Sequence, residues 1–331
     1  FNSQDLANTA WSFATRCFRN PEMMDSQSSE VITKLAEFAP QGLATTAWAY
    51  SSLGVRDPTL LDAISAEVLR KLGEIEPQSL GILADARLDC REAVEQTLRP
   101  LAERFVSELP RALEPSAVAA FAQFVREMRV DNFGAWGTRF VFRHMGFPEP
   151  PPDFCERAGR QIVASVSSGG EERLGREATN ALTGAALVHR RVFSYAEYDL
   201  EVHAGGARVP VAGSMAKENG RRERGPPEEG SRRERGAPVS ACLLQSLASP
   251  ISGLVDRSLC SEFQLLNAVL ELTLQARGGS AAAPRGRVRL FVSTAPCVSC
   301  IWALRQFQLL LPEATVEVAN GEEAYLFSSS S

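Results

Sequence analysis

The sequence predicts a multidomain protein in which an all-α helical-repeat solenoid precedes an α/β domain of three layers. Two observations predict this order. A motif recurs with a period of 37 residues through the first half of the chain, and helix and strand patterns alternate near its end. We expect a repeat array over residues 1–147, a linker with a short helix over residues 148–186, and the α/β domain over residues 187–331.

The composition is that of a globular protein. Hydrophobic residues make up 44% of the 331 residues and charged residues 23%. No run of about eighteen apolar residues occurs, so we expect no membrane contact through a spanning helix. The seven cysteines contain one close pair and no regular framework, which argues against a secreted disulfide scaffold and for a reducing intracellular compartment. Because the chain begins at Phe1, inside a helix start, we expect a fragment whose targeting peptide is out of view.

The repeat is clearest in its first two copies. Matching residues 37 positions apart are Phe1 and Phe38, Gln4 and Gln41, Leu6-Ala7 and Leu43-Ala44, and Ala10-Trp11 and Ala47-Trp48. The same frame continues at Ile75-Glu76-Pro77-Gln78, and a weaker fourth copy starts at Leu113-Glu114-Pro115. Four copies on one spacing indicate a repeat rather than chance similarity.

Each unit is expected to contain two helices. Pro near the first turn opens the first helix, whose small Ala residues allow close packing between units. The second helix is illustrated by the segment from Thr59 to Leu72, which follows Asp57-Pro58 and stops at Gly73.

Two tryptophans of the repeat could either bind RNA or pack in the core. Trp11 and Trp48 could stack on nucleobases. The third and fourth units carry Asp85 and Gln123 at this position, so we favour packing of both Trp side chains in the core between repeats.

Residues 40–49 resemble the helical repeats of known families. Their frame, Pro-Gln-x-Leu-Ala-x-x-Ala-Trp-Ala, resembles the helical repeats of octotricopeptide-type and FAST-kinase-like proteins, and is similar to those of a trypanosome mitochondrial RNA-editing substrate-binding subunit. The resemblance implies single-stranded RNA as a partner and a mitochondrion or other organelle as the compartment. Residues 1–150 contain 15 Lys and Arg against 20 Asp and Glu, which argues against bulk electrostatic attraction of RNA. Protein partners of the repeat array remain an alternative.

We expect the repeat array to end at Pro148-Glu149-Pro150-Pro151-Pro152, because a helix does not continue through such a proline-rich segment. We expect a modest helix over residues 154–166 and strand structure within residues 187–203. Residues 205–238 are rich in Gly, Pro, Arg and Glu, with Arg-Arg-Glu-Arg-Gly occurring twice. This composition predicts a disordered insert, which we interpret as a solvated loop rather than an RNA contact.

The final segment predicts helices over residues 261–275 and 297–311 and strands over residues 288–292 and 315–319. Both helices begin next to cysteines, which occur as Cys260-Ser261-Glu262 and as Pro296-Cys297-Val298-Ser299-Cys300. A helix N-terminus favours thiolate over thiol.

These cysteines predict a zinc site. Cys260, Cys297 and Cys300 supply three thiolate ligands for Zn²⁺, which leaves a fourth position for water. Glu262 then serves as the catalytic proton carrier, and Arg257 could offset the excess negative charge. A purely structural zinc would need a fourth ligand, for which the candidates are Cys242, His189 and His203. Three buried cysteines without metal are a further alternative, and we expect His144 to be a packed or surface residue.

The same two motifs, together with Gln306-Phe307 and Leu311-Pro312, resemble the cytidine deaminase-like superfamily and are similar to bacterial polymorphic-toxin deaminases. The resemblance implies a deaminase-like fold, zinc as the cofactor and the site residues named above. We therefore predict a zinc-dependent deaminase that acts on RNA, with C-to-U conversion favoured. The alternatives are a non-catalytic RNA-binding scaffold with a relic deaminase fold, and a deaminase of free nucleosides.

Overall fold

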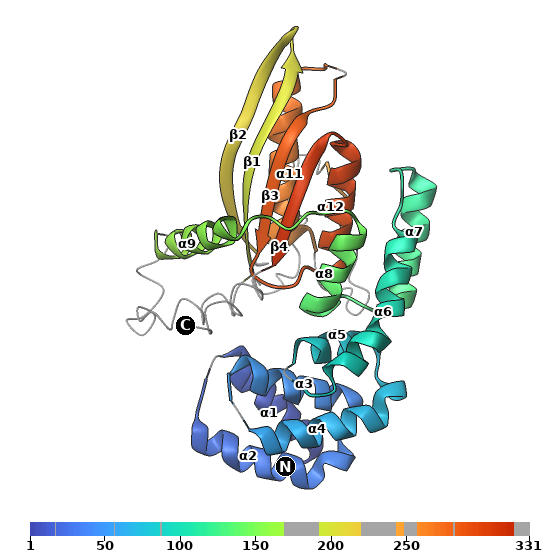
Figure 1. The fold of residues 1–331 in the computed structure, drawn as a ribbon, viewed down its shortest axis with the longest axis vertical. Helices are drawn as coiled ribbons and strands as arrows, with labels where there is room; N and C mark the ends of the chain where they lie inside the picture. Colours follow the sequence, from blue (N-terminus) through green and yellow to red (C-terminus); the bar gives the residue numbers. More distant parts are fainter. Residues whose placement is uncertain are drawn as a thin grey trace, which may run out of the picture.

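The computed structural model describes residues 1–168 (except 17, 56 and 87), 192–219, 243–247, 257–280 and 282–320. Within these residues, the N-terminal part is helical and the C-terminal part is a four-stranded mixed sheet with helices (Figure 1). A helical region followed by an α/β domain is therefore observed. None of the described helices is long and apolar enough to cross a membrane.

Proline begins most helices of the N-terminal part, at the position where its missing N–H costs no hydrogen bond. The helices are α1 (Ser3–Thr15), α2 (Pro21–Lys34), α3 (Pro40–Ser52), α4 (Pro58–Lys71), α5 (Pro77–Asp85), α6 (Arg91–Glu108), α7 (Pro115–Met128) and α8 (Gly134–His144), with short 3₁₀ turns η1 (Leu35–Glu37) and η2 (Leu72–Glu74). Each of the first two units is thus a helix pair that ends in a 3₁₀ turn.

The 37-residue spacing extends to the contacts of the second helices. Lys34, at the end of α2, donates to the carbonyl oxygen of Phe1 at 2.5 Å. Lys71, at the end of α4, donates to the carbonyl oxygen of Phe38 at 2.6 Å and also to that of Ala36 at 3.1 Å. In both units, therefore, a Lys at the end of the second helix donates a hydrogen bond to the segment that precedes the first helix.

The first helices lie in a row in which α1 packs against α3 and α3 packs against α5. Trp48 is partly buried against the core, as expected, because α3 has neighbours in the row on both sides. The expectation was wrong for Trp11, which is 51% exposed. Its helix, α1, has a described neighbour in the row on one side.

The repeat predicts that a fourth copy, beginning at Pro115, packs next to α5 in the row, and this expectation was wrong. A helix does begin at Pro115, but α5 packs against α8 rather than against α7. Gly81 allows this contact, because a Cβ atom there would lie 2.9 Å from the carbonyl oxygen of Asn132. The first two units carry Ala7 and Ala44 at the equivalent position.

Two side chains of α5 hold the connection between α7 and α8. Gln78 Oε1 accepts hydrogen bonds from the backbone N–H groups of Asp131 at 3.0 Å and Asn132 at 3.3 Å. Asp85 accepts from the N–H of Ala135 at 2.7 Å, in the first turn of α8. Gln78 and Asp85 occupy the repeat positions of Gln4 and Trp11. In the third unit these two positions therefore bind the connection between α7 and α8.

The sheet has the strand order β2-β1-β3-β4, with β1–β2 and β1–β3 antiparallel and β3–β4 parallel. Its strands are β1 (Phe193–Ala204), β2 (Ala207–Glu218), β3 (Arg285–Val292) and β4 (Ala314–Asn320). The helices of this part are α9 (Pro152–Ser168), η4 (Arg257–Leu259), α11 (Ser261–Arg277) and α12 (Val298–Leu310). All four elements predicted for residues 261–319 are confirmed, with somewhat different ends.

The predicted disordered insert over residues 205–238 begins too early. Gly205 and Gly206 adopt left-handed backbone conformations and form a tight turn, after which β2 pairs with β1 along its whole length. Val211 and Met215 pack against the core from the inner face of β2, a period-2 signal that the Gly- and Arg-rich composition obscured. Residues 220–238 lie outside the described part of the chain.

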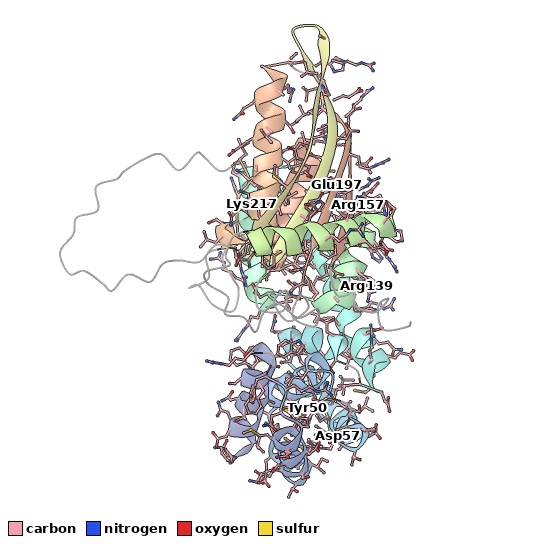
Figure 2. The ribbon with its side chains drawn as sticks, turned by 90° about the vertical axis from the view of Figure 1, so that its left-hand side faces the viewer. Tyr50, Asp57, Arg139, Arg157, Glu197 and Lys217 are labelled. Atoms are coloured by element: carbon pink, nitrogen blue, oxygen red, sulfur yellow. The ribbon has the colours of Figure 1, made fainter. Side chains whose placement is uncertain are left out.

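The sheet is covered on both faces. Side chains of one face, such as Leu200 and Leu290, join the core that contains α11 and α12. On the other face, Phe154 and Ile162 of α9 pack against Tyr195 and its neighbours. Arg157 of α9 also pairs with Glu197 of β1 at 3.0 Å (Figure 2).

The helical region and the α/β domain contact each other directly. The ring of Phe121 in α7 lies 5.3 Å from that of the buried Trp302 in α12. The N–H of Val318 in β4 donates to the carbonyl oxygen of Pro148 at 3.2 Å. The α7–α8 connection reaches the start of α12, where Asn132 Nδ2 donates to the carbonyl oxygen of Ala295 at 2.6 Å.

Candidate metal centre

Two helix starts place the cysteines. Cys260 is the N-cap residue of α11 and Cys297 that of α12, and both have the extended backbone usual at this position. Neither side chain caps its own helix. Cys300 lies in the first turn of α12, where its N–H donates to the carbonyl oxygen of Cys297 at 2.9 Å. The prediction that both cysteine motifs lie at helix N-termini is therefore confirmed.

The three sulfur atoms converge. The Sγ atoms of Cys260, Cys297 and Cys300 all lie within 4.8 Å of one another, and those of Cys297 and Cys300 are 3.5 Å apart. All three residues are buried. A tetrahedral zinc ion with sulfur ligands at about 2.3 Å places those ligands about 3.8 Å apart. The cluster could therefore hold a metal ion, and both its donor type and its spacing suit zinc.

The electrostatics of the cluster favour a bound cation. Hydrogen bonds from Cys297 and Cys300 lower the pKa of Cys260 to about 4. The same contact with Cys260 raises the pKa of Cys297 to about 11, and contact and burial together raise that of Cys300. Without a metal ion, one thiolate is thus stabilised by two thiols. A divalent cation would allow all three sulfur atoms to carry negative charge.

Arg257 lies beside the cluster, as anticipated. Its guanidinium pairs with the carboxylate of Asp131 and donates to the sulfur of Cys260. Burial would lower the pKa of Arg257, but its interactions with Cys297, Asp131 and Cys260 outweigh burial and raise the pKa. Asp131 comes from the α7–α8 connection, so the helical region contributes to the electrostatics of the cluster.

Glu262 occupies the first turn of α11 and is 3% exposed. Ser261 Oγ lies 3.2 Å from Glu262 Oε2 as a hydrogen-bond donor, and 2.8 Å from Ser194 Oγ at the start of β1. Burial raises the pKa of Glu262 to about 7. The Cys300 thiol also donates to this carboxylate. The predicted proton carrier therefore lies next to the predicted ligands.

Sequence reasoning missed the residues that hold these helix starts in place. Asn219, which follows β2, accepts a hydrogen bond from the N–H of Ser261 at 2.6 Å. The carbonyl oxygen of Asp131 accepts from the N–H of Val298 at 2.8 Å. Helix caps are normally local in sequence. These partners lie 42 residues or more from the helix that they cap, so no local pattern could have revealed them.

The other candidate ligands are placed as follows. His203 lies near the β1–β2 turn, opposite Arg208, and does not belong to the cysteine cluster found among the described residues. His144 is exposed, and its ring stacks on that of Phe140 with centroids 4.0 Å apart. Cys242 and His189 lie outside the described residues. Within the described part of the chain, the ligand group therefore has three members.

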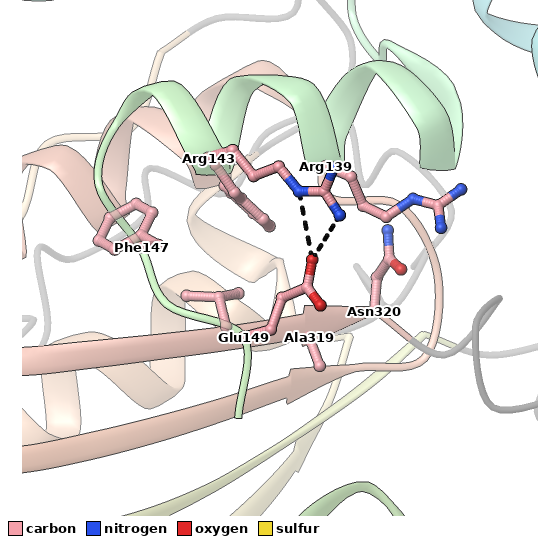
Figure 3. Close-up of a pocket in the computed structure, with 8 residues that line it drawn as sticks. Arg139, Arg143, Phe147, Glu149, Ala319 and Asn320 are labelled. Atoms are coloured by element: carbon pink, nitrogen blue, oxygen red, sulfur yellow. Dashed lines mark hydrogen bonds and ion pairs between the residues drawn. The ribbon is translucent and has the colours of Figure 1, made fainter. Parts of the chain in front are cut away.

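A small cavity lies near the ends of α8 and β4, on the side where β3 and β4 both end (Figure 3). The ion pair between Arg143 and Glu149 closes one side of it, and neither polar atom of the buried Asn320 amide has a partner among the described residues. Its volume of about 10 Å³ is sufficient for about one water molecule. We therefore interpret it as a water site rather than a substrate pocket.

No protein-family model, curated protein or solved structure matches this chain. The resemblances to deaminases and to RNA-binding repeat families therefore stay predictions.

Proposed function

We propose that the chain is a zinc-dependent nucleobase deaminase that acts on RNA, with C-to-U conversion favoured and the helical region as the RNA-binding platform. The observation that carries the proposal is the convergence of Cys260, Cys297 and Cys300 beside the buried carboxylate of Glu262. Three sulfur ligands leave one of the four zinc positions open. A neighbouring carboxylate that is not needed as a ligand is suited to proton transfer.

In the proposed deamination, the metal centre, Glu262 and Ser261 have different roles. A bound zinc ion would supply Lewis-acid activation of a water molecule. Glu262 would accept a proton from this water and deliver it to the ring nitrogen of the base and then to the departing amine. Hydrolysis at C4 of cytosine consumes one water and releases ammonia, which leaves uracil. Ser261 would orient the carboxylate of Glu262.

Exposed side chains in the first two units support RNA as the substrate. Trp11 is 51% exposed, and Gln4, seven residues earlier, lies on the same face of α1. Gln41 and Trp48 occupy the equivalent positions in α3, where Trp48 is partly exposed. Since residues 1–150 are acidic on balance, we expect base stacking and hydrogen bonds, rather than bulk charge, to provide this affinity.

A second candidate function is a zinc-stabilised RNA-binding scaffold without catalysis. The observation that favours it is burial, because Glu262 is 3% exposed and Cys260, Cys297 and Cys300 are 7%, 8% and 0% exposed. A base must reach the metal for deamination, so this state of the described residues presents little of the site to a substrate.

The decisive experiment compares wild type with Glu262→Gln, a change of charge with little change of shape. Zinc-loaded protein is mixed in excess with short single-stranded RNAs that contain one C or one A, and conversion is followed over time. We expect conversion of C by wild type and a loss of about 100- to 10,000-fold in Glu262→Gln. Zinc content and unfolding temperature should stay unchanged in the variant.

The matched controls separate the alternatives. Equal conversion by wild type and Glu262→Gln, or none by zinc-loaded wild type, would contradict the proposal and favour the scaffold. Free cytidine added as a competitor tests the substrate class, because stronger conversion of the monomer than of RNA would identify a nucleoside deaminase.

A further inference from the structure

A second cavity lies at the junction between the helical region and the α/β domain, and its lining comes from the end of α6, the segments that follow α6 and α8, and Arg305 of α12. Its volume is about 270 Å³. Three basic side chains line it, Arg111, His144 and Arg305, and the rest of the lining is Ser107 with apolar side chains. No Asp or Glu among the described residues belongs to this lining.

Arg305 is fixed across the junction. Its Nε donates to the carbonyl oxygen of Pro110 at 2.9 Å, and its Nη1 donates to Gln308 Oε1 at 3.0 Å. Gln308 in turn donates to the carbonyl oxygen of Met145 at 3.2 Å, just after α8. These two bonds use two of the five N–H donors of a guanidinium, so the side chain is oriented without being saturated.

The positive charges of this cavity are close enough to affect one another. Burial, and then the charge of Arg111, lower the pKa of Arg305. The side chain of His144 is also held, because its Nδ1 lies 2.8 Å from the carbonyl oxygen of Phe140. Two guanidinium groups therefore line one small space, and a bound anion would relieve the repulsion between them.

We propose that this cavity binds a phosphate group, with Arg111 and Arg305 as its ligands. Guanidinium groups match phosphate oxygens in pairs, which gives both charge and direction to the contact. The volume of about 270 Å³ is sufficient for a phosphate group, and the two arginines decide the ligand class. The phosphate could belong to an RNA backbone or be free in solution, and only the RNA source rests on the proposed function.

The first test measures thermal unfolding of the full chain in sodium phosphate and in sodium chloride at matched ionic strength. Phosphate at about ten times its Kd should raise the Tm of wild type by about 3 °C. Arg111→Gln and Arg305→Gln should each abolish most of this shift. Arg160→Gln, in which an exposed Arg of α9 loses the same charge, should keep it.

The second test measures the affinity of the same variants for single-stranded RNA over a range of salt concentrations. If the phosphate comes from RNA, Arg111→Gln should weaken binding about fivefold and reduce the salt slope by about 0.7, while Arg160→Gln does neither. If RNA binding is unchanged but the phosphate shift in Tm is lost, the ligand is a free phosphate and the site stands.

The proposal is overturned if phosphate stabilises neither wild type nor control more than chloride does while RNA affinity is the same in all variants. That result would mean that Arg111 and Arg305 only complement the carbonyl ends of α6 and α8. A failed deaminase assay leaves both tests intact, because neither involves the metal centre.

Discussion

Two groups of buried polar side chains, one in each region, are compensated differently. In the helical region, the ammonium of Lys71 is surrounded by two backbone carbonyl groups and the carboxylate of Glu67. In the α/β domain, three cysteines and Glu262 lie against one another, with Arg257 beside them. The Lys71 cluster balances its own charge. The cysteine cluster reaches full ionisation only with an added cation.

This difference separates a structural cluster from a candidate functional one. Lys34 and Lys71 make the same contact in successive units, so their role is to close each unit. The cysteines bring together the starts of two helices that are distant in sequence, and they keep their sulfur atoms out of helix capping. Arg257 is one cation beside three cysteines and Glu262, and burial of acids that outnumber their counter-charges is costly and characteristic of sites that bind a ligand.

The largest expected effect comes from breaking the cysteine cluster. Cys300→Ser should reduce the zinc content from one ion per chain to a trace, and the stability that zinc provides should be lost. At a free zinc concentration of about 1,000 Kd, this is about 4 kcal/mol. Elemental analysis and denaturant unfolding, each with and without a chelator, measure both effects. Cys155→Ser, in α9, is the control, and an equal loss of zinc from it would contradict the assignment.

The next largest effect, a loss of stability, should come from replacing Lys71, whose charge is balanced within its own cluster. Lys71→Met leaves two carbonyl groups without their donor and Glu67 with Arg70 as its remaining partner, which should lower the free energy of unfolding by about 2–3 kcal/mol. Lys34→Met removes the equivalent but more exposed contact and should cost about 0–1 kcal/mol. Urea unfolding compares the two variants. Equal losses would show that burial does not distinguish the two units.

A smaller effect should mark the connection between the two regions. Gln78→Ala removes the acceptor of two backbone N–H groups and should cost about 1–2 kcal/mol. Gln41→Ala changes an exposed residue at the same repeat position and should stay within about 0.5 kcal/mol. Hydrogen exchange at residues 131–135 should rise in Gln78→Ala alone. Unchanged exchange there would contradict a role of Gln78 in holding this segment.

The smallest effect concerns pH. Hydrogen bonds from Arg70 and then Lys71 lower the pKa of Glu67 to about 2, from an ordinary value of about 4.5. A carboxyl with a lowered pKa stabilises the fold above its unfolded-state pKa, and this contribution is lost as the pH falls towards 2. The stability difference between wild type and Glu67→Gln should therefore be constant near pH 7 and disappear between about pH 4.5 and 2. A difference that persists at pH 2 would contradict this account.

The sequence predicted the features that local patterns encode. Proline marks the starts of most helices in the first half, and the alternation of Thr315–Ala319 marks a strand. The cysteine motifs predicted a cluster because Cys-Ser-Glu followed by Pro-Cys-Val-Ser-Cys has the ligand pattern of a zinc site. The cluster is confirmed, because the three sulfur atoms lie within 4.8 Å of one another.

Features that depend on distant contacts escaped prediction. Nothing near Pro115 shows that α8 replaces α7 in the row, because the cause is the absence of a side chain at Gly81. Asn219 and Asp131 hold the two helix starts from far away in sequence. Strand β2 was missed because its Gly-Gly turn and exposed polar residues resemble the composition of a disordered segment.

The most direct test of the cysteine cluster is zinc K-edge X-ray absorption spectroscopy of the zinc-loaded chain. We predict three sulfur ligands at about 2.3 Å and one oxygen ligand at about 2.0–2.2 Å. Glu262→Gln should give the same spectrum, since Glu262 is not expected to bind the metal. Four sulfur or nitrogen ligands without oxygen, or a chain that binds no zinc, would contradict the account of an open catalytic metal centre.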